Sequence, residues 1–508
     1  MLKKEYLTRI LAARVYDLAE QTPLTELANV STETGAHVLL KREDLQPIFS
    51  FKIRGAANKV AQMPDEDRKR GVITSSAGNH AQGLAMTAKA YGIPATIVMS
   101  QSTPSIKIKA VEGLGAKVVL HGDTLEDAYD CAMDISAETG MTFVHPFDDA
   151  DVIAGQGTVG MEVLQQCKQR PYAVFVPIGG GGLIAGMGAY IKSVAPDVKI
   201  IGVEPEGAAG MHASFAAGHP VTLNKIDRFA DGVAVRAIGK LSYELAKECV
   251  DDIILVSTDE ICAAVRDIFE GARAIMEPSG ALALAGLKRY ARKNDVKGQE
   301  LVAIASGANV NFDRFGTIVE RAELGSGGEA LLAVTIPEKP GSFLKFCKLI
   351  GRRNITEFNY RYSCDNSAQV LAGIRLTGGK GEREELVKSI ADEGLPVSDL
   401  TRNEVAKRHV RHMIGGPVKT PEREVVYRFE FPERPGALVD FLSSLAGRWS
   451  ISMFHYRNHG SAYGQVLLGM QVPEKDGAEF EKFLTSTGFE FREETGNPAY
   501  QAFLVDTD

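Results

Sequence analysis

Short apolar runs alternate with amphipathic segments from about residue 35 to residue 320, and this alternation constrains the fold more than any other feature. Eight runs end in small or polar residues and read as buried strands: HVLLKRED, GVITSS, ATIVMS, KVVLHG, TFVHPF, AVFVPIGG, KIIGVEPEG and LVAIASGAN. The segments between them place apolar residues at helical spacing. This alternation predicts an α/β fold with parallel sheets covered by helices on both faces. Ligands in such sheets bind beyond the carboxyl ends of the strands.

A duplicated segment follows this region. Residues 330–362 resemble residues 423–458, because each reads as a strand, a Pro-Glu-basic-Pro-Gly turn, an apolar helix and a strand ending in Phe-x-Tyr-Arg. Gly341 aligns with a glycine 95 residues later, and Tyr360 aligns with a tyrosine 96 residues later, so one inserted residue reconciles the copies. Two copies indicate an internal duplication rather than a solenoid.

The length of 508 residues is that of about three domains. A Gly/Ser-rich stretch precedes the duplication and is typical of a linker. We therefore expect a first domain over 1–322, a linker over 323–329, and two repeats over 330–415 and 416–508.

Composition excludes several classes of function. The chain is 44% hydrophobic and 24% charged, and its net charge of −8 disfavours a nucleic-acid or anionic-membrane surface. Six scattered cysteines form neither a CxxC motif nor a pair with metal-ligand spacing, so we expect reduced thiols and no metal site. The N-terminal segment is acidic in places and has no signal-like apolar run, and no stretch approaches eighteen apolar residues. We expect a cytoplasmic protein with no membrane span.

The glycine run Gly179 to Gly182 lies between an apolar strand and a helical segment, in VFVPIGGGGLIAG. Glycines let backbone N–H groups approach an anion closely, and a helix N-terminus adds partial positive charge, so a phosphate is the natural ligand. A tight turn is the structural alternative. Gly180, Gly182 and Ala185, with Glu204 ending the next strand, also satisfy a dinucleotide-binding pattern, which keeps a nicotinamide enzyme open.

A second small-residue loop, SSAGNHAQG, leads into another helical segment. Ser75, Ser76 and Asn79 offer hydroxyl and amide groups beside free backbone N–H donors, which suit a carboxylate or a ring hydroxyl. The alternative is a helix N-cap followed by a glycine turn. We interpret His80 as a packed or capping histidine rather than a base.

Three further residues have both a structural and a functional interpretation. Ser306, in SGANVNF, ends a strand, where its hydroxyl could bond a heteroaromatic nitrogen. Glu277, in EPSGA with Ser279, stands before a helix start, where capping explains it as well as function does. Lys52, in SFKIRGA, is flanked by apolar residues, and alone reads as a lysine that extends from the edge of a core.

The order of these motifs resembles that of the fold type II pyridoxal-phosphate enzymes, and most closely that of the biosynthetic threonine deaminases. The shared order is SFKIRGA, SSAGNHAQG, GGGGL, EPSGA and SGANVNF, followed by the duplicated VTIPEKPGSFLKF and FPERPGAL. The resemblance covers almost the whole chain, and the combination is specific although each motif alone is not. It implies a catalytic domain of the tryptophan synthase β type, with two parallel sheets, and a C-terminal α+β domain of two ACT-like repeats.

The resemblance also implies an activity and a cofactor. The chain would use pyridoxal 5'-phosphate to deaminate L-threonine, by loss of water, to 2-oxobutanoate and ammonia, the first step of isoleucine biosynthesis. Serine would be a secondary substrate, and the enzyme would be a homotetramer. A serine rather than a carboxylate at the pyridine nitrogen would favour elimination over transamination. The sequence identifies no proton donor for the leaving hydroxyl other than the cofactor phosphate.

Residue roles follow from the same resemblance. Lys52 would hold the cofactor covalently and later take the substrate α-proton, for which burial must keep its amine neutral. The residues expected around the cofactor are Phe51 near the ring, Asn79 at the ring hydroxyl, Gly179, Gly180, Gly181 and Gly182 at the phosphate, and Ser306 at the pyridine nitrogen. The substrate carboxylate would be received by Ser75, Ser76, Gly78 and Asn79.

The two C-terminal repeats would sense amino acids, with isoleucine as the feedback inhibitor and valine as the opposing activator. Candidate effector residues are Phe358, Tyr360, Tyr456 and Arg457, although aromatic residues at strand ends are as often core. A plain oligomerisation domain is the alternative to a sensor.

Two other classes of protein remain open on the residues alone. One is the nicotinamide-dependent oxidoreductase indicated by the glycine pattern. The other is an amino-acid-binding protein on an inactive enzyme scaffold, which the intact Lys52, Asn79 and Ser306 argue against.

Overall fold

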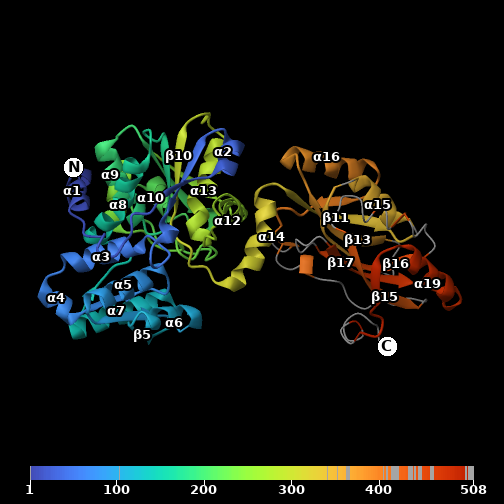
Figure 1. The fold of residues 1–508 in the computed structure, drawn as a ribbon, viewed down its shortest axis with the longest axis horizontal. Helices are drawn as coiled ribbons and strands as arrows, with labels where there is room; N and C mark the ends of the chain where they lie inside the picture. Colours follow the sequence, from blue (N-terminus) through green and yellow to red (C-terminus); the bar gives the residue numbers. More distant parts are fainter. Residues whose placement is uncertain are drawn as a thin grey trace. The chain divides into compact units, whose positions relative to one another are not determined.

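The computed structural model divides the chain into two compact units, Met1–Gly325 and Ser326–Asp508 (Figure 1). The structure describes residues 2–500 except 102, 340, 352, 362–366, 404–405, 408–409, 413–422, 433–438, 440–441, 444–448, 458–462 and 498–499. The division falls inside the segment 323–329, where we expected a linker. Helix α14 (Phe315–Gly325) extends into that segment, and strand β11 begins at Glu329.

The first unit contains a six-stranded sheet in the order β1-β2-β10-β7-β8-β9. All neighbouring strands pair in parallel except the edge strand β1, which is antiparallel to β2. The strands are β1 (Leu24–Glu26), β2 (His37–Arg42), β7 (Ala173–Pro177), β8 (Lys199–Pro205), β9 (Asp252–Val256) and β10 (Glu300–Ala305).

A second, four-stranded parallel sheet has the order β5-β4-β3-β6. In Figure 1 its helices α4 to α7 gather with β5 below the larger sheet of the same unit. The strands are β3 (Val72–Ser75), β4 (Ala95–Met99), β5 (Lys117–Leu120) and β6 (Thr142–Phe143). The eight strands expected from apolar runs are all present, whereas β1 and β9 were not predicted.

Helices cover both faces of each parallel sheet. Side chains of α1, α8, α9 and α11 pack with Val174 and Val176 on one face of the large sheet, and those of α2, α12, α13 and α14 pack with Ala173 and Phe175 on the other. The smaller sheet is covered by α3 and α5 on one face and by α7 on the other. The predicted fold class is therefore confirmed, because successive strand residues feed opposite apolar layers.

The helices of the first unit have the following bounds. They are α1 (Leu2–Leu11), α2 (Ala28–Thr34), α3 (Lys52–Gln62), α4 (Asp65–Arg70), α5 (Asn79–Tyr91), α6 (Ser105–Gly113), α7 (Leu125–Thr139), α8 (Ala150–Gln166), α9 (Gly182–Val194), α10 (Gly210–Ala217), α11 (Lys240–Cys249), α12 (Thr258–Ala272), α13 (Pro278–Ala291) and α14, with 3-10 turns η1 (Glu43–Leu45), η2 (Glu206–Ala208) and η3 (Phe312–Arg314). Within the described residues, no helix has both the length and the apolar character that crossing a bilayer requires.

The second unit is built on one antiparallel sheet of eight strands, in the order β14-β11-β13-β12-β16-β17-β15-β18. Its elements are β11 (Glu329–Pro337), α15 (Ser342–Ile350), β12 (Ile355–Arg361), β13 (Ser367–Arg375), α16 (Gly379–Asp392), β14 (Val397–Asp399), η4 (Val410–His412), β15 (Glu424–Pro432), β16 (Ser450–Arg457), β17 (Tyr463–Gln471), η5 (Glu474–Asp476), α19 (Gly477–Ser486) and β18 (Glu490–Glu493). The order reads the same from both ends when each strand is replaced by its copy in the other repeat.

The two repeats join through β12 and β16 at the centre of this sheet. Phe358 pairs with Tyr456, and Tyr360 pairs with Phe454, on either side of the pair formed by Asn359 and His455. Each strand therefore meets its own copy in antiparallel register, as a local twofold axis requires. Side chains of α15, α16 and α19 pack on one face of the sheet in a single apolar core.

Candidate active site

One cleft of about 520 Å³ in the first unit brings together most of the predicted site residues. Its lining includes every residue predicted to contact the cofactor: Phe51, Lys52, Asn79, Gly179, Gly180, Gly181, Gly182 and Ser306. These residues follow β7 and β10 of the large sheet and β3 of the small one, or begin α3. Segments separated by more than a hundred residues thus meet at the carboxyl ends of parallel strands, where such sheets bind ligands.

Lys52 is the first residue of α3, and its amine reaches the cleft. Its Nζ donates a hydrogen bond to the Pro146 carbonyl oxygen at 2.6 Å and lies 5.3 Å from the centroid of the Phe51 ring. Burial lowers the pKa of the Lys52 amine to about 8, because the charged ammonium form is poorly solvated there. A substantial neutral fraction is therefore available near pH 7 for attack on a carbonyl or for proton abstraction.

The glycine run forms the turn from β7 to α9. Gly181 has φ of +96°, a conformation that favours glycine. A Cβ at Gly180 would lie 2.1 Å from the Phe147 ring, and one at Gly182 would lie 2.7 Å from the Phe147 carbonyl oxygen. The run is thus a tight turn packed closely against Phe147, and it lines the cleft at a helix N-terminus, which is suited to a phosphate.

Asn79 begins α5 and is held by two side chains. Its Nδ2 donates to Glu277 Oε1 at 2.7 Å, and its Oδ1 accepts from Asn309 Nδ2, also at 2.7 Å. Glu277 immediately precedes α13 but makes no side-chain capping bond there within the described residues. The capping interpretation of Glu277 is therefore wrong, because its carboxyl group points to Asn79.

The cleft also holds polar groups that a ligand would satisfy. Ser306 Oγ donates to the Ser279 carbonyl oxygen at 3.2 Å. The Ser279 hydroxyl and the Gln156 amide line the cleft, and these buried groups have no hydrogen-bond partner among the described residues. Buried polar groups are rarely left unpaired. A buried lysine amine, a glycine run at a helix N-terminus, an amide donor and a strand-end hydroxyl together fit the pyridoxal phosphate that the resemblance implied.

The residues predicted to receive the substrate carboxylate are only partly in the cleft. Asn79 lines it, whereas Ser75, Ser76 and Gly78 precede Asn79 in the loop and are not among the described lining residues. Ser76 Oγ accepts the Gly78 N–H at 3.3 Å. The Ser75 hydroxyl is buried with no hydrogen-bond partner within the described chain.

The geometry excludes one alternative sequence interpretation and agrees with another. Glu204, the acid of the dinucleotide pattern, accepts the Met211 and His212 N–H groups at 2.8 Å each, so its carboxyl group is committed to the start of α10. His80 is buried, and burial lowers its pKa to about 3. Its Nε2 donates to the Val144 carbonyl oxygen at 3.0 Å, which makes it a packed histidine rather than a base, as the sequence indicated.

Sequence reasoning missed a buried cluster of four charges behind Lys52. Arg54 Nε contacts Glu43 Oε2 at 2.7 Å, and Arg54 Nη1 contacts Glu162 Oε1 at 2.6 Å. Lys41 Nζ contacts the other Glu162 oxygen at 2.5 Å, and all four side chains are inaccessible to solvent. The cluster ties β2, η1 and α8 to the first turn of α3, which carries Lys52. The only signal was the charged run KRED, which reads equally well as a solvated surface.

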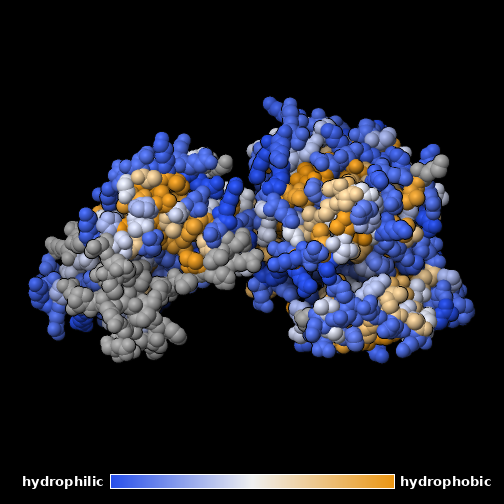
Figure 2. All heavy atoms as spheres, turned by 180° about the vertical axis from the view of Figure 1, so that it is seen from behind, coloured by the Kyte–Doolittle hydropathy of each residue, from blue (hydrophilic) through white to orange (hydrophobic). Residues whose placement is uncertain are grey.

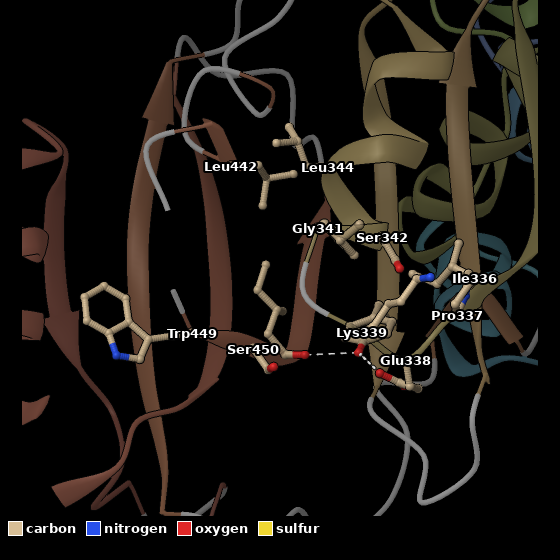
Figure 3. A pocket seen from close by; sticks show the side chains of 13 residues that line it. Ile336, Pro337, Glu338, Lys339, Gly341, Ser342, Leu344, Leu442, Trp449 and Ser450 are labelled. Atoms are coloured by element: carbon tan, nitrogen blue, oxygen red, sulfur yellow. Dashed lines mark hydrogen bonds between the residues drawn. The ribbon is translucent and has the colours of Figure 1, made fainter. Parts of the chain in front are cut away.

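A second pocket, of about 600 Å³, lies between the two repeats of the second unit (Figure 3). Its walls are the turn after β11, the start of α15, and the segment leading into β16. Tyr360 lines it and bonds through its hydroxyl to Glu338 Oε2 at 2.8 Å and to the Ile451 carbonyl oxygen at 3.0 Å, the dashed lines in Figure 3. Apolar side chains, including Ile336 and Leu344, complete the lining.

The four candidate effector residues lie in different places. Of the three whose side chains are described, Tyr360 lines this pocket, while Phe358 and Tyr456 are buried in the apolar core of the sheet. Arg457 is the last residue of β16, and its side chain lies outside the described part of the chain. Of the motif FPERPGAL, residues 433–438 also lie outside it.

Comparison with protein-family models matches both units. Residues 15–307 match the pyridoxal-phosphate-dependent enzyme family. Residues 320–410 and 415–504 each match the C-terminal regulatory domain of threonine dehydratase.

Individual relatives agree over the whole length. The chain is 50% identical to a biosynthetic L-threonine dehydratase of Burkholderia multivorans, over 99% of this chain and 100% of the relative. It is 48% identical to the Escherichia coli protein of that name, over 99% and 97%. Among solved structures, the processed form of threonine deaminase isoform 2 from Solanum lycopersicum has a TM-score of 0.62 and 46% identity, covering 63% of this chain and 93% of that one.

Proposed function

This chain belongs to the biosynthetic threonine dehydratases of the pyridoxal-phosphate-dependent enzyme family, and from that membership we propose the roles of its residues. It catalyses the deamination of L-threonine to 2-oxobutanoate and ammonia, and its second unit is regulatory. The observation that supports the residue roles is the Lys52 amine in one cleft with a glycine cradle, an amide and a strand-end hydroxyl. The nicotinamide interpretation is withdrawn, because full-length relatives are threonine dehydratases and Glu204 is committed elsewhere.

Pyridoxal phosphate, when bound, supplies an electron-withdrawing ring that makes the substrate Cα–H acidic. The phosphate would be held by the backbone N–H groups of Gly179 to Gly182 and by the start of α9. Ser306 would meet the pyridine nitrogen, Phe51 would pack near the ring, and Asn79 would donate to the ring hydroxyl.

Lys52 performs the proton transfer in this proposal. Its Nζ would take the α-proton of the substrate, which requires the neutral amine that burial favours. The Pro146 carbonyl oxygen accepts a hydrogen bond from Nζ at 2.6 Å, and this bond fixes the direction in which the amine points. The leaving β-hydroxyl needs a proton from another group in the cleft.

The substrate carboxylate would bind at the turn between β3 and α5. Ser75, Ser76, Gly78 and Asn79 form this turn, and the first N–H groups of α5 favour an anion. The buried Ser75 hydroxyl, with no partner among the described residues, is one further donor for it. Because a pocket that accepts a β-hydroxyl also admits L-serine, we propose serine as a secondary substrate.

We assign the effector site to the pocket between the repeats. Ile336, Leu344 and Ile451 offer apolar surface to a branched side chain, while Glu338 can receive an ammonium group and Lys339 a carboxylate. These groups suit a branched-chain amino acid, and we propose isoleucine as the inhibitor and valine as the opposing activator. Of the residues chosen from sequence, Tyr360 is the one placed to contact them.

We also propose a homotetramer in the cytoplasm. Hydrophobic residues gather in patches on the face of each unit shown in Figure 2, as surfaces that associate do. The described cysteines are free thiols, which fits a reducing compartment.

The test of the proposed function has three parts. Purified enzyme should convert L-threonine to 2-oxobutanoate, and borohydride reduction followed by peptide mapping should place the cofactor on Lys52. Isoleucine should inhibit, and valine should oppose that inhibition. Cofactor attached to any other lysine would refute the assignment of Lys52.

A truncation separates the two units. Ending the chain after Gly325 keeps α14, which the ion pair between Arg321 and Asp259 holds against α12. The truncated enzyme should deaminate threonine without inhibition by isoleucine. Inhibition that persists would move the effector site into the first unit.

A further inference from the structure

Glu277 is a buried carboxyl group in the catalytic cleft, and none of the residue roles proposed above involves it. It lines the cleft with Lys52 and Ser306, and only 4% of its surface is exposed. Its Oε1 accepts a hydrogen bond from Asn79 Nδ2 at 2.7 Å. The partner of this buried acid is therefore the residue to which we assign the cofactor's ring hydroxyl.

The hydrogen bonds around Asn79 allow one orientation of its amide. Asn309 Nδ2 donates to the Ile48 carbonyl oxygen at 2.8 Å and to Asn79 Oδ1 at 2.7 Å. Because a backbone carbonyl can only accept, Asn309 must present its NH2 group here, and Asn79 must present its oxygen. The Asn79 NH2 group then faces Glu277, which accepts one of its two hydrogens.

We propose that Glu277 is a positioning residue that acts through Asn79. By accepting one amide hydrogen of Asn79, it directs the second into the cleft, toward the oxygen of the cofactor's ring hydroxyl. The hydrogen bonds that link Asn309, Asn79 and Glu277 thus hold one amide hydrogen of Asn79 toward the cleft. An asparagine without these partners would point it there only part of the time. The inference rests on the proposed role of Asn79.

Glycines at two positions make room for this contact. A Cβ at Gly307 would lie 2.6 Å from Glu277 Oε1 and 3.2 Å from Asn79 Nδ2. A Cβ at Gly232 would lie 3.3 Å from Glu277 Oε1. The Glu277 N–H also donates to the Gly307 carbonyl oxygen at 3.3 Å, so the loop after β10 holds both ends of the pair.

Burial favours the neutral form of Glu277 more than the charges around it oppose that form. Its pKa is raised to about 8, mainly by burial and also by Asp231, although the Asn79 bond, Lys107 and Arg314 act in the opposite direction. Lys107 and Arg314 are themselves paired with Asp231, at 2.8 and 3.2 Å, and Lys52 is the remaining cation of the cleft. At pH 7 the carboxyl group keeps its proton, and its carbonyl oxygen remains the acceptor for Asn79. A glutamine offers the same acceptor.

The experiment compares the holoenzyme with Glu277→Gln, Glu277→Leu, Asn79→Ala and the double variant Asn79→Ala/Glu277→Leu. E277L should lower kcat by about 10- to 100-fold, as loss of a hydrogen bond to a charged or reacting group does. It should also shift the visible absorption maximum of the bound cofactor. E277Q should stay within about threefold of the wild type at pH 7 and keep its spectrum, because the acceptor is retained. In the N79A background, E277L should add less than about twofold, since the two residues act as one unit.

Failure of the inference can be told apart from failure of the proposed function. If the wild type neither holds cofactor nor deaminates threonine, the proposed function fails. If the wild type does both, two results overturn the role of Glu277: an E277L enzyme with an unchanged spectrum and kcat, or an effect that multiplies with that of N79A. Should E277L not fold by circular dichroism, Asn309→Ala releases the other end of Asn79. It should shift the same absorption maximum, and an unshifted spectrum would equally overturn the inference.

Discussion

The catalytic cleft and the pocket between the repeats use their side chains in opposite ways. The cleft holds the amine of Lys52, the amide of Asn79 and the carboxyl group of Glu277 in fixed hydrogen bonds. The pocket is lined mostly by apolar side chains. One of them is Phe343, whose ring centroid lies 4.9 to 5.3 Å from those of Phe358, Tyr360 and Phe454. Chemistry requires polar groups whose orientation is set in advance, whereas sensing a branched side chain requires shape and apolar surface.

The interactions that hold the elements around the two sites also differ. Four buried charges hold the helix that carries Lys52. In the second unit, each repeat places one glutamate against a hydroxyl at an irregular point of its strand, Glu329 with Thr356 and Glu424 with Ser452. The two pairs are related by the 95- and 96-residue offsets of the duplication. The same support therefore occurs once in each repeat of the regulatory sheet, whereas the helix that carries Lys52 is held by a cluster of buried charges.

The largest expected effect comes from removing the amine of the cleft. Lys52→Ala should lower kcat by about 10⁴-fold or more, because both the covalent attachment of the cofactor and the base are lost. Turnover is measured as 2-oxobutanoate formed from threonine. The regulatory pocket should be unaffected, so isoleucine should still change the fluorescence of Trp449, the single tryptophan.

Lys59→Ala is the matched control for that variant. Lys59 lies on the same helix, but it pairs with Asp149 at 2.7 Å and Asp151 at 3.2 Å outside the cleft. Its kcat should remain within about threefold of the wild type, since partly exposed ion pairs contribute little. A Lys52→Ala enzyme that kept full turnover, or a Lys59→Ala enzyme that lost it, would place the reactive amine elsewhere.

The second effect is on stability and should be confined to the first unit. Arg54→Met leaves Glu43 and Glu162 buried with only Lys41 as a cation, and should cost about 3–5 kcal/mol of unfolding free energy. Urea denaturation followed by cofactor absorbance reports on the first unit, while Trp449 fluorescence reports on the second. Only the first transition should move. Arg9→Ala, which removes exposed pairs with Glu5 and Asp151, should change it by less than about 0.5 kcal/mol. Equal shifts of both transitions would contradict this separation.

The buried charges around Arg54 also show which features cannot be predicted from sequence. The run from Lys41 to Asp44 reads as a charged surface, yet all four residues are buried. Burial of a charge depends on partners such as Arg54 and Glu162, which are distant in sequence, so no local pattern could reveal it. The strands were predicted more successfully from the apolar runs, because a parallel strand buried on both faces is apolar along its own sequence. Strand β9, with the sequence DIILV, fits the same rule and was overlooked, whereas β1 has three residues and no pattern.

The candidate site was predictable only as a combination. Lys52, Asn79, the glycine run and Ser306 each have an adequate structural explanation alone. Their common order along the chain pointed to one family, and the fold then brings them to one cleft. The role of Glu277 could not be chosen from sequence, because capping and catalysis both place an acid before a helix. Among the effector candidates, aromatic character alone did not distinguish Tyr360 at the pocket from Phe358 in the core.

The third effect concerns pH and follows from the burial of Lys52. Only the neutral amine attacks the cofactor aldehyde, and burial lowers its pKa to about 8. In the apoenzyme, the rate of cofactor attachment should therefore rise about tenfold per pH unit below pH 8 and level off above it. The growth of visible absorbance after mixing measures this rate. N-acetyl-lysine methyl ester is the reference, and its reaction should continue to accelerate toward about pH 10, the range of an unperturbed lysine. An apoenzyme that followed the reference would show that Lys52 is not desolvated.

The smallest effect should appear in the regulatory pocket. Tyr360→Phe removes the hydroxyl that bonds to Glu338 and to the Ile451 carbonyl oxygen, and so loosens the contact between the repeats. Loss of one such bond is worth about 0.5–1.5 kcal/mol, which corresponds to roughly a two- to tenfold weaker inhibition by isoleucine. Without isoleucine, kcat should not change.

Tyr456→Phe is the matched control, because Tyr456 is the copy of Tyr360 in the second repeat but does not line this pocket among the described residues. The isoleucine concentration for half-inhibition and the Trp449 fluorescence titration should shift together for Tyr360→Phe and less for Tyr456→Phe. Equal shifts would mean that the two repeats contribute equivalent effector contacts, although Tyr456 is not among the described residues that line this pocket. A change in kcat without isoleucine would instead mean that Tyr360 acts on the cleft, and the contrast between a polar catalytic site and an apolar sensing site would lose its functional meaning.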